Sequence, residues 1–302
     1  MLIAPLSPPA HVVVYSDFDY VTIDAKRRRV YAAHTGSRTL LIVDADSGKP
    51  LGQVEVGPMH GVAVDPATGT VFTGDGTERT VSKVNPTTQM VLAQTGVPGP
   101  VDAIAYDPAA QRIYADEDSG TEVYAIDARS MKLLARIRLL GHDEEFLAVD
   151  PRSHVVYQNV ADLDEFVEID PKTLRVFKIV HTPALKANHP LQVDAALNEL
   201  LVGGENGVLA AYRPDGTLLG TTRYPADVDQ CNLDAAHGLL ACAGNGVIAL
   251  LRVVPNAAPT TLATLDTHHA IHTLAIDPKT QNIFAVWAGP NGDFVQRFHL
   301  AP

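Results

Sequence analysis

Three features of the sequence predict an all-β fold made of seven repeated units. A phrase of the form apolar-x-apolar-Asp occurs seven times, and successive aspartates are 40 to 44 residues apart. Each unit contains four short runs with a period of two and many β-branched or aromatic residues, and no long stretch has a helical period. Four strands in a unit of about 42 residues are typical of a propeller blade. We therefore expect a single domain, residues 1–302, folded as a seven-bladed β-propeller with four antiparallel strands per blade.

The four expected strands follow one another in the same order in each unit. The first strand ends at the repeated aspartate, and a turn follows, as in the segment DPATG at residues 65–69, where Pro and Gly suit turn geometry. The second strand is represented by residues 29–33 and the third by residues 40–44. Residues 132–138 are an example of the fourth strand. The repeated aspartates are Asp24, Asp65, Asp107, Asp150, Asp194, Asp234 and Asp277.

The seventh unit has one strand too few, because the chain ends soon after the run at residues 294–299. A spare β-branched run, HVVVY at residues 11–15, precedes the first unit. We expect residues 1–15 to provide the outer strand of the last blade, which would close the ring and remove an exposed sheet edge.

Composition excludes several classes of function. The 302 residues carry a net charge of −12, which argues against a nucleic-acid binder or a protein of anionic membrane surfaces, since both need basic patches. No apolar stretch approaches the ~20 residues that span a bilayer. The start of the chain lacks the pattern of a signal peptide, so we expect a cytoplasmic protein. The alternative is a periplasmic or secreted protein whose signal has been removed.

The sequence motifs of the first blades are similar to those of a known family. Residues 30–44 read VYAAHTGSRTLLIVD, and residues 57–66 read GPMHGVAVDP. These phrases resemble the YVTN-repeat β-propellers, and the resemblance extends over nearly the whole chain, with departures in blades five and six. It implies the propeller fold. It implies little about function, because members of the family include binding proteins, lyases and lactonase-like enzymes.

A column of titratable residues appears when the seven units are aligned on their aspartates. The position five residues before each aspartate is always Asp, Glu or His, although these types make up only about a sixth of the chain. This position begins the innermost strand, so we expect all seven side chains at one mouth of the central channel. They are Asp19, His60, Asp102, Glu145, His189, Asp229 and His272.

This ring predicts a divalent metal site. His60, His189 and His272 approach the axis from three sides, and imidazole groups with carboxylates suit Zn, Fe, Mn or Ni. We expect these three histidines to be ligands, with Glu145 as the most favoured carboxylate ligand. The remaining acids, Asp19, Asp102 and Asp229, are candidates for a general base or for orienting the histidines. The alternative is a polar rim that only contacts water.

Other candidates lie in the loops after the second strands, which share this face. His34 is a candidate for acid–base chemistry, and its alternative is an ordinary polar loop residue. Arg38 and Arg79 occupy matching positions and are candidates for binding a substrate carboxylate, unless they are solvated surface charges. Trp287, the only tryptophan, either walls a substrate pocket or packs between blades.

The two cysteines, Cys231 and Cys242, fall on neighbouring strands of blade six and are expected to face each other. We expect two buried thiols, with a disulfide as the alternative. Phosphate-binding loops, dinucleotide fingerprints and nucleophile elbows are absent from the sequence, so no nucleotide cofactor is suggested.

Together these observations favour a metal-dependent enzyme, a hydrolase, lactonase or lyase acting on a small polar substrate. The alternatives are a binding or scaffold propeller that holds a protein, peptide or metal ion on its top face, and a metal-binding protein without chemistry. We expect a monomer with a small-molecule substrate and with neither nucleic acid nor membrane as a partner.

Overall fold

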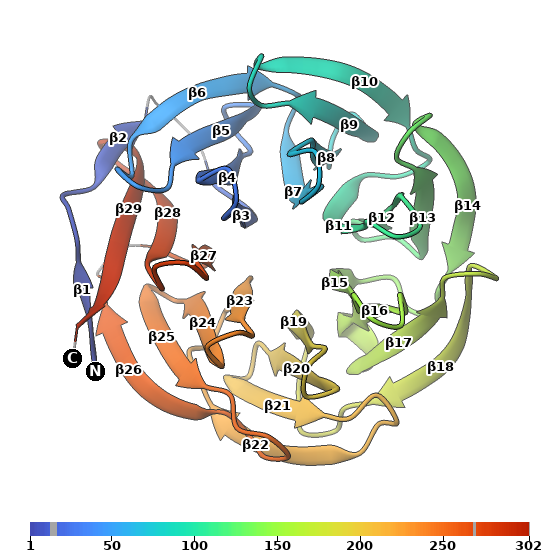
Figure 1. The fold of residues 1–302 in the computed structure, drawn as a ribbon. Coiled ribbons are helices and arrows are strands. Elements are labelled where there is room, and N and C mark those ends of the chain that lie inside the picture. Colours follow the sequence, from blue (N-terminus) through green and yellow to red (C-terminus); the bar gives the residue numbers. More distant parts are fainter. Residues whose placement is uncertain (13–16, 268–269, 302) are drawn as a thin grey trace.

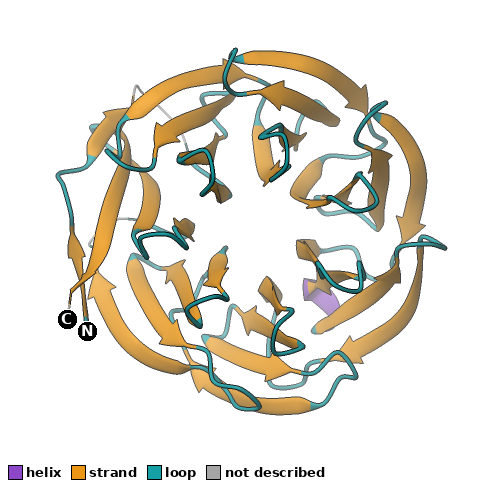
Figure 2. Cartoon of the chain, viewed as in Figure 1, coloured by secondary structure: helices purple, strands orange, loops and turns teal. Residues whose placement is uncertain are grey.

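The computed structural model describes residues 1–12, 17–267 and 270–301, and it is a ring of seven antiparallel sheets around a central channel (Figure 1). The predicted seven-bladed, all-β propeller is confirmed. Almost no helix is present: the part of the chain that the structure describes has one short 3₁₀ turn, η1 (Ala161–Leu163), within blade four (Figure 2). No helix among these residues is long and apolar enough to span a bilayer.

Each of the first six blades consists of four consecutive strands, numbered from the channel outward. Blade one contains β3 (Val21–Asp24), β4 (Arg29–His34), β5 (Thr39–Asp44) and β6 (Pro50–Glu55). Blade two contains β7 (Met59–Val64), β8 (Val71–Asp75), β9 (Thr80–Asn85) and β10 (Met90–Gly96). Blade three contains β11 (Val101–Asp107), β12 (Arg112–Glu117), β13 (Glu122–Asp127) and β14 (Lys132–Arg138).

The next three blades repeat this order. Blade four contains β15 (Glu144–Val149), β16 (Val156–Val160), β17 (Glu165–Asp170) and β18 (Arg175–His181). Blade five contains β19 (Asn188–Asp194), β20 (Glu199–Gly204), β21 (Val208–Tyr212) and β22 (Leu218–Arg223). Blade six contains β23 (Cys231–Asp234), β24 (Leu239–Gly244), β25 (Val247–Arg252) and β26 (Thr260–Asp266).

Blade seven combines the two ends of the chain. Its inner strands are β27 (Leu274–Ile276), β28 (Ile283–Gly289) and β29 (Gly292–Ala301). Both β1 (Leu2–Pro5) and β2 (Ala10–Val12) pair antiparallel with β29 and form the outer layer. The predicted closure by the N-terminal segment is confirmed, but the pairing residues begin at Leu2, earlier than the expected run 11–15, most of which lies outside the described residues.

Salt bridges reinforce this closure. Arg28 of blade one donates two hydrogen bonds, of 2.9 and 2.7 Å, to the carboxylate of Asp277 in blade seven. The Asp277 side chain has no solvent exposure, so its charge depends on this arginine for compensation. The seam between the first and last blades is therefore held by charge as well as by strand pairing.

The core lies between adjacent sheets. On β5, Leu40 and Ile42 pack toward blade two, whereas Leu41 and Val43 pack toward blade seven. This division follows from the alternation of side chains along a strand, and it explains why the four central residues of β5 are all apolar and buried. Each sheet is thus fixed by both neighbours, which gives the inner strands a rigid frame.

The repeated aspartates hold the turns after the inner strands. Asp65 accepts hydrogen bonds from the main-chain N–H of Ala67 at 2.9 Å and from the hydroxyl of Thr68 at 2.6 Å. Asp107 accepts an equivalent bond from Ala109 at 2.9 Å. An aspartate that bonds its own backbone two residues on is a local turn former, so the recurring phrase records a structural requirement.

Cys231 and Cys242 are directly opposite each other on β23 and β24, as predicted, with Cα atoms 4.1 Å apart. They form a disulfide, so the expectation of two free thiols is wrong and the alternative holds. The register brings the two side chains onto one face of the hairpin at the close approach typical of directly opposed strand residues.

Candidate functional site: a ring of histidines and carboxylates

The seven aligned residues lie at or just before the start of the innermost strand of each blade. The ion pairs between them join residues of different blades. Their side chains are partly buried, with between 15% and 40% of their surface exposed, so they can be reached from solvent. The predicted gathering of this column around the channel is therefore what the structure shows.

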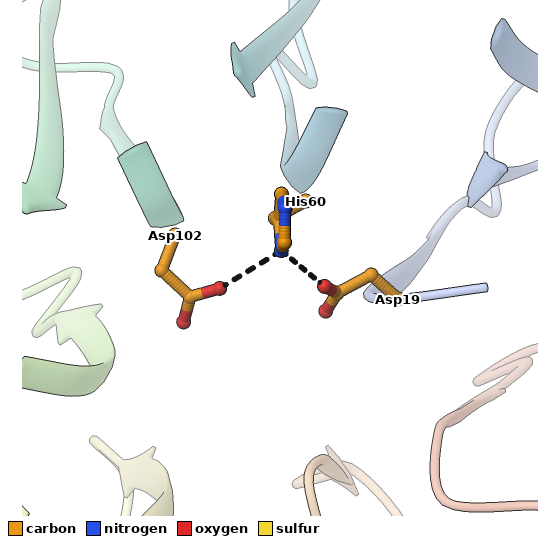
Figure 3. Close-up of side chains that lie close together, drawn as sticks. All are labelled: Asp19, His60 and Asp102. Atoms are coloured by element: carbon orange, nitrogen blue, oxygen red, sulfur yellow. Dashed lines mark ion pairs between the residues drawn. The ribbon is translucent and has the colours of Figure 1, made fainter. Parts of the chain in front are cut away.

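His60 lies between two aspartates of the neighbouring blades (Figure 3). Its Nδ1 is 2.6 Å from Oδ2 of Asp19 in blade one and 3.5 Å from Oδ1 of Asp102 in blade three. One ligand atom from each residue lies within 4.8 Å of the other two. Tyr20, next to Asp19 in the chain, donates a hydrogen bond of 3.0 Å to the other oxygen of Asp102.

The other four ring residues form a second chain of contacts. Nε2 of His189 is 3.1 Å from Glu145 and 2.9 Å from Asp229. Nδ1 of His272 is 3.4 Å from the second oxygen of Asp229. Each histidine of the ring therefore faces at least one carboxylate from an adjacent blade.

This arrangement differs from the predicted ligand set. His60, His189 and His272 each turn toward acids, and among the described residues the group with the spacing of a metal site is Asp19, His60 and Asp102. Glu145 contacts His189 and not His60. Because seven is an odd number, acids and histidines cannot alternate throughout, and the two adjacent acids are Asp102 and Glu145 in blades three and four.

The contacts of His60 shift the pKa values of both partners. Burial by itself lowers the pKa of His60, but hydrogen bonds to Asp102 and Asp19 and the charges of these groups raise it to about 11. Burial raises the pKa of Asp19 to about 7, against the hydrogen bond from His60 and with the added repulsion of Asp229 and Asp102. At neutral pH, His60 therefore carries a proton and Asp19 titrates.

In the second chain of contacts, the pKa values of the two carboxyl groups are shifted in opposite directions. Burial raises the pKa of Glu145 to about 9, although the charge of His189 opposes this. Burial would also raise the pKa of Asp229, but hydrogen bonds from His189 and His272 hold it well below its usual range. The pKa of His189 rises to about 10, because its contacts with Asp229 and Glu145 outweigh burial. A neutral carboxylic acid thus lies beside a charged carboxylate and an imidazolium.

Apolar side chains meet across the channel next to the ring. Tyr20 and Phe146, each one residue after a ring member, make an edge-to-face contact with centroids 5.4 Å apart. They help to line a small cavity of about 30 Å³. Gln230 spans from blade six to blade one, where its amide bonds both the N–H and the carbonyl of Val21 at 2.9 Å.

A larger cavity of about 460 Å³ adjoins the ring between blades six and seven. His272 belongs to both the ring and this cavity. The lining residues are Asp227, Asn245, Gly246, Asp266, Ala270, Ile271 and His272.

Two of the surrounding candidates are buried away from this space. His34 has no solvent exposure, stacks on Phe18 with centroids 4.3 Å apart, and places Nε2 2.7 Å from Asp293. Trp287 is 3% exposed and stacks on Phe294 at 5.4 Å, in the core between blades six and seven. Trp287 therefore packs between blades, which was the alternative to a role in a substrate pocket. His34 has a partner, Asp293, in the seam between blades one and seven.

Arg38 and Arg79 occupy equivalent turns, as predicted, each with a positive φ. Their carbonyl groups accept hydrogen bonds from Val56 and Val97 at 3.1 and 2.8 Å. Arg38 is exposed and forms an ion pair with Glu78. The Arg79 guanidinium makes one long contact, of 3.4 Å, with the carbonyl of Pro98. Neither arginine is an ion-pair partner of a ring residue, and their role in substrate binding stays a prediction.

Sequence reasoning missed the residues that complete the site. Tyr20 and Phe146 stand one position after the ring column, in blades one and four, and an aligned aromatic pair is a signal that the repeat contained. Glu144, one position before the column, is 1% exposed, and neither of its carboxylate oxygens has a hydrogen-bond partner. The equivalent residues Met59 and Val101 in blades two and three are buried and apolar.

The comparisons with known proteins identify the fold. No known family profile matches the chain, and no curated protein matches it, so the YVTN-repeat resemblance is not confirmed. Solved propellers superpose over nearly its whole length. The β-propeller domain of Cps50 (Swd1) from Myceliophteria thermophila has a TM-score of 0.79 at 10% identity, covering 97% of this chain and 100% of that one.

Two further structures are similar to the same extent. U3-55K has a TM-score of 0.80 at 9% identity, with 99% of this chain and 98% of that chain covered. Kuenenia stuttgartiensis hydrazine synthase has a TM-score of 0.76 at 14% identity, with 94% and 97% covered. At these identities the likeness shows the fold alone, and function has to be argued from the site.

Proposed function

We propose that the protein is a metal-dependent hydrolase or lyase for a small polar substrate. The observation that carries this proposal is the group Asp19, His60 and Asp102, whose ligand atoms from three adjacent blades lie within 4.8 Å of one another. Two carboxylates and one imidazole are a common donor set for divalent transition metals, and three protein ligands leave a position open for substrate.

The spacing of the three residues suits such an ion. Metal–ligand bonds of about 2.1 Å in tetrahedral geometry place neighbouring ligand atoms roughly 3.4 Å apart. The two ion-pair distances at His60, 2.6 and 3.5 Å, bracket this value. Tyr20 fixes the second oxygen of Asp102, which is the usual role of a residue behind a metal ligand.

A bound divalent ion would supply Lewis acidity that polarises a substrate oxygen. Other ring residues would provide proton transfer. Glu145, with its pKa of about 9, holds a proton at neutral pH and can donate it to a leaving group. His189 contacts Glu145 and Asp229 and orients the acid toward the channel. The cavity that reaches the ring at His272 has room for a small substrate.

The first experiment measures metal binding. We expect about one equivalent of Zn²⁺ or Mn²⁺ per chain by calorimetry and elemental analysis, lost in Asp102→Asn and His60→Ala. His142→Ala is the matched control, since His142 is exposed and its ion pair is with Asp162, which is not a ring residue. His189→Ala distinguishes the two ligand sets: it leaves stoichiometry unchanged if Asp19, His60 and Asp102 bind the ion, and abolishes it if the three histidines do.

The second experiment tests chemistry. The metal-loaded protein is assayed against a panel of lactones, esters and hydroxy acids, with Glu145→Gln as the acid variant. We expect turnover that requires the metal and falls at least tenfold in Glu145→Gln with metal stoichiometry intact. Absence of stoichiometric metal under every loading condition would overturn the proposal.

One observation favours a second candidate, a binding propeller without metal. The histidines of the ring are paired with carboxylates in the protein alone, so the ring can neutralise much of its own charge. In that case the ring is a polar binding surface. The expected result is then that the protein binds no metal but still binds a ligand at this face.

A further inference from the structure

The outer strand of blade two, β10, differs from the outer strands of the other blades. It contains no charged residue over its seven positions, MVLAQTG, and it lies within an uncharged stretch from residue 84 to residue 101. The outer strands β6, β14, β18, β22 and β26 all contain Asp, Glu, Lys or Arg. In blade seven, β1 ends in a proline and β2 has only three residues.

Three consecutive apolar side chains of this strand are exposed. Met90 is 59% exposed, Val91 38% and Leu92 52%. Apolar residues are exposed on β14 as well, but there Leu134 is flanked by Lys132 and Arg136. β10 therefore offers exposed apolar side chains with no charged residue on the strand itself, and Lys83 of β9, opposite Ala93, lies on its paired side.

An outer strand has one edge on which its backbone N–H and C=O groups lack a strand partner. Proteins usually protect such edges with charged side chains, with proline or with very short strands, and the other blades use these devices. β10 contains neither a charged residue nor a proline within its seven residues. The register of β10 shifts between Val91 and Ala93, but the outer strands of blades one, three, four, five and six have a similar shift, so what distinguishes β10 is its lack of charge. A segment of seven residues with high β-propensity and no charge is also typical of strands that pair between chains.

We propose that β10 is a self-association surface, at which two copies of this chain pair their β10 strands antiparallel across a twofold axis. A second copy is the favoured occupant for a reason of charge. Each chain carries −12, so two copies repel each other wherever charged surface meets charged surface, and the uncharged segment allows the closest approach at the least cost. An antiparallel strand paired with itself is also isologous, so the contact closes as a dimer.

The size of the contact predicts a weak dimer. Seven residues of strand extend about 23 Å, and a contact of this length belongs to the small class of interfaces below about 1,200 Å². We expect dissociation in the micromolar range or above, and association that strengthens with salt because salt screens the repulsion between acidic chains. This proposal differs from the monomer expected from the sequence.

Sedimentation velocity tests it on the full chain from 1 to 300 µM, at 0.05 and 0.5 M NaCl. We expect the wild-type protein to shift from monomer to dimer across this range, more at high salt. Leu92→Lys and Val91→Lys should raise the dissociation constant at least tenfold. Leu134→Lys, on the equivalent strand of blade three, is the matched control and should leave it unchanged.

Circular dichroism of each variant establishes that the fold is retained. A wild-type protein that stays monomeric at all concentrations overturns the proposal. So does a dimer that persists in both β10 variants, or one that the Leu134→Lys control weakens to the same degree, because the contact would then not depend on β10.

Discussion

The hydroxyl group of Tyr20 donates a 3.0 Å hydrogen bond to Asp102, which joins blade one to blade three across His60. Tyr20→Phe removes this hydrogen bond and retains the aromatic side chain that packs on Phe146. We expect the apparent affinity for Zn²⁺ to fall 10- to 100-fold, the usual effect of losing a residue that orients a ligand. Calorimetry checks this. Tyr106→Phe, at a tyrosine remote from the ring, is the control, and an unchanged affinity in Tyr20→Phe would contradict the assigned role.

Metal binding should depend on pH. A metal must displace the proton of His60, whose pKa is about 11, and below pH 7 it must also displace that of Asp19, whose pKa is about 7. Asp102 and Asp229 face the same space and keep these protons bound. We therefore expect the apparent association constant to rise up to 100-fold from pH 6 to 7 and about tenfold from pH 7 to 8. Competition against a coloured chelator measures it, and a flat profile would exclude proton displacement.

Glu144 should destabilise the protein as the pH rises. Burial raises its pKa from the usual 4.5 to about 9, so the unfolded chain loses this proton at a lower pH than the folded chain does. Stability is therefore lost progressively between these two values. Glu144→Met, which copies Met59 of blade two, removes the carboxyl group. We expect it to raise the free energy of unfolding by roughly 1–3 kcal/mol at pH 8 and by much less at pH 4.5. Urea unfolding at the two pH values measures this difference. An equal gain in the free energy of unfolding at both pH values would show that packing alone is responsible.

The seam between blades one and seven should be sensitive to one arginine. Arg28→Ala leaves the Asp277 carboxylate buried without its bidentate partner, and we expect a loss of about 3–5 kcal/mol in stability. Arg38→Ala removes an exposed arginine paired with Glu78, and it should change stability far less than Arg28→Ala does. Thermal and urea unfolding of the two variants provide the comparison. Similar losses in both would mean that the seam does not depend on this pair.

The repeat made the architecture predictable. Asp65 and its counterparts recur because each turn needs a side chain that bonds its own backbone, and this local requirement is visible in sequence. The ring column was predictable for the same reason, since it keeps a constant distance from those turns. The contacts between individual ring residues were not predictable, because they depend on how far each side chain reaches across the channel. His60 approaches Asp19 and Asp102, whereas the sequence pattern alone favoured convergence of the three histidines.

Other features lay beyond sequence reasoning because they depend on contacts between blades. The burial of His34 depends on how blades one and seven meet, and that of Trp287 on how blades six and seven meet. The disulfide of Cys231 and Cys242 depends on the exact separation of two paired strands, although their register was predictable from the hairpin.

The composite seventh blade also imposes an order on folding during synthesis. Strand β1 is made near the start of the chain, whereas its partner β29 is completed only at residue 301. At about 5–20 residues per second, the ribosome needs roughly 15–60 s to make the residues between them. During this time blades one to six can form in sequence while the N-terminal segment waits without its partner. The N-terminal strands are thus among the last to reach their place, and the ring remains an open arc until β29 has been made.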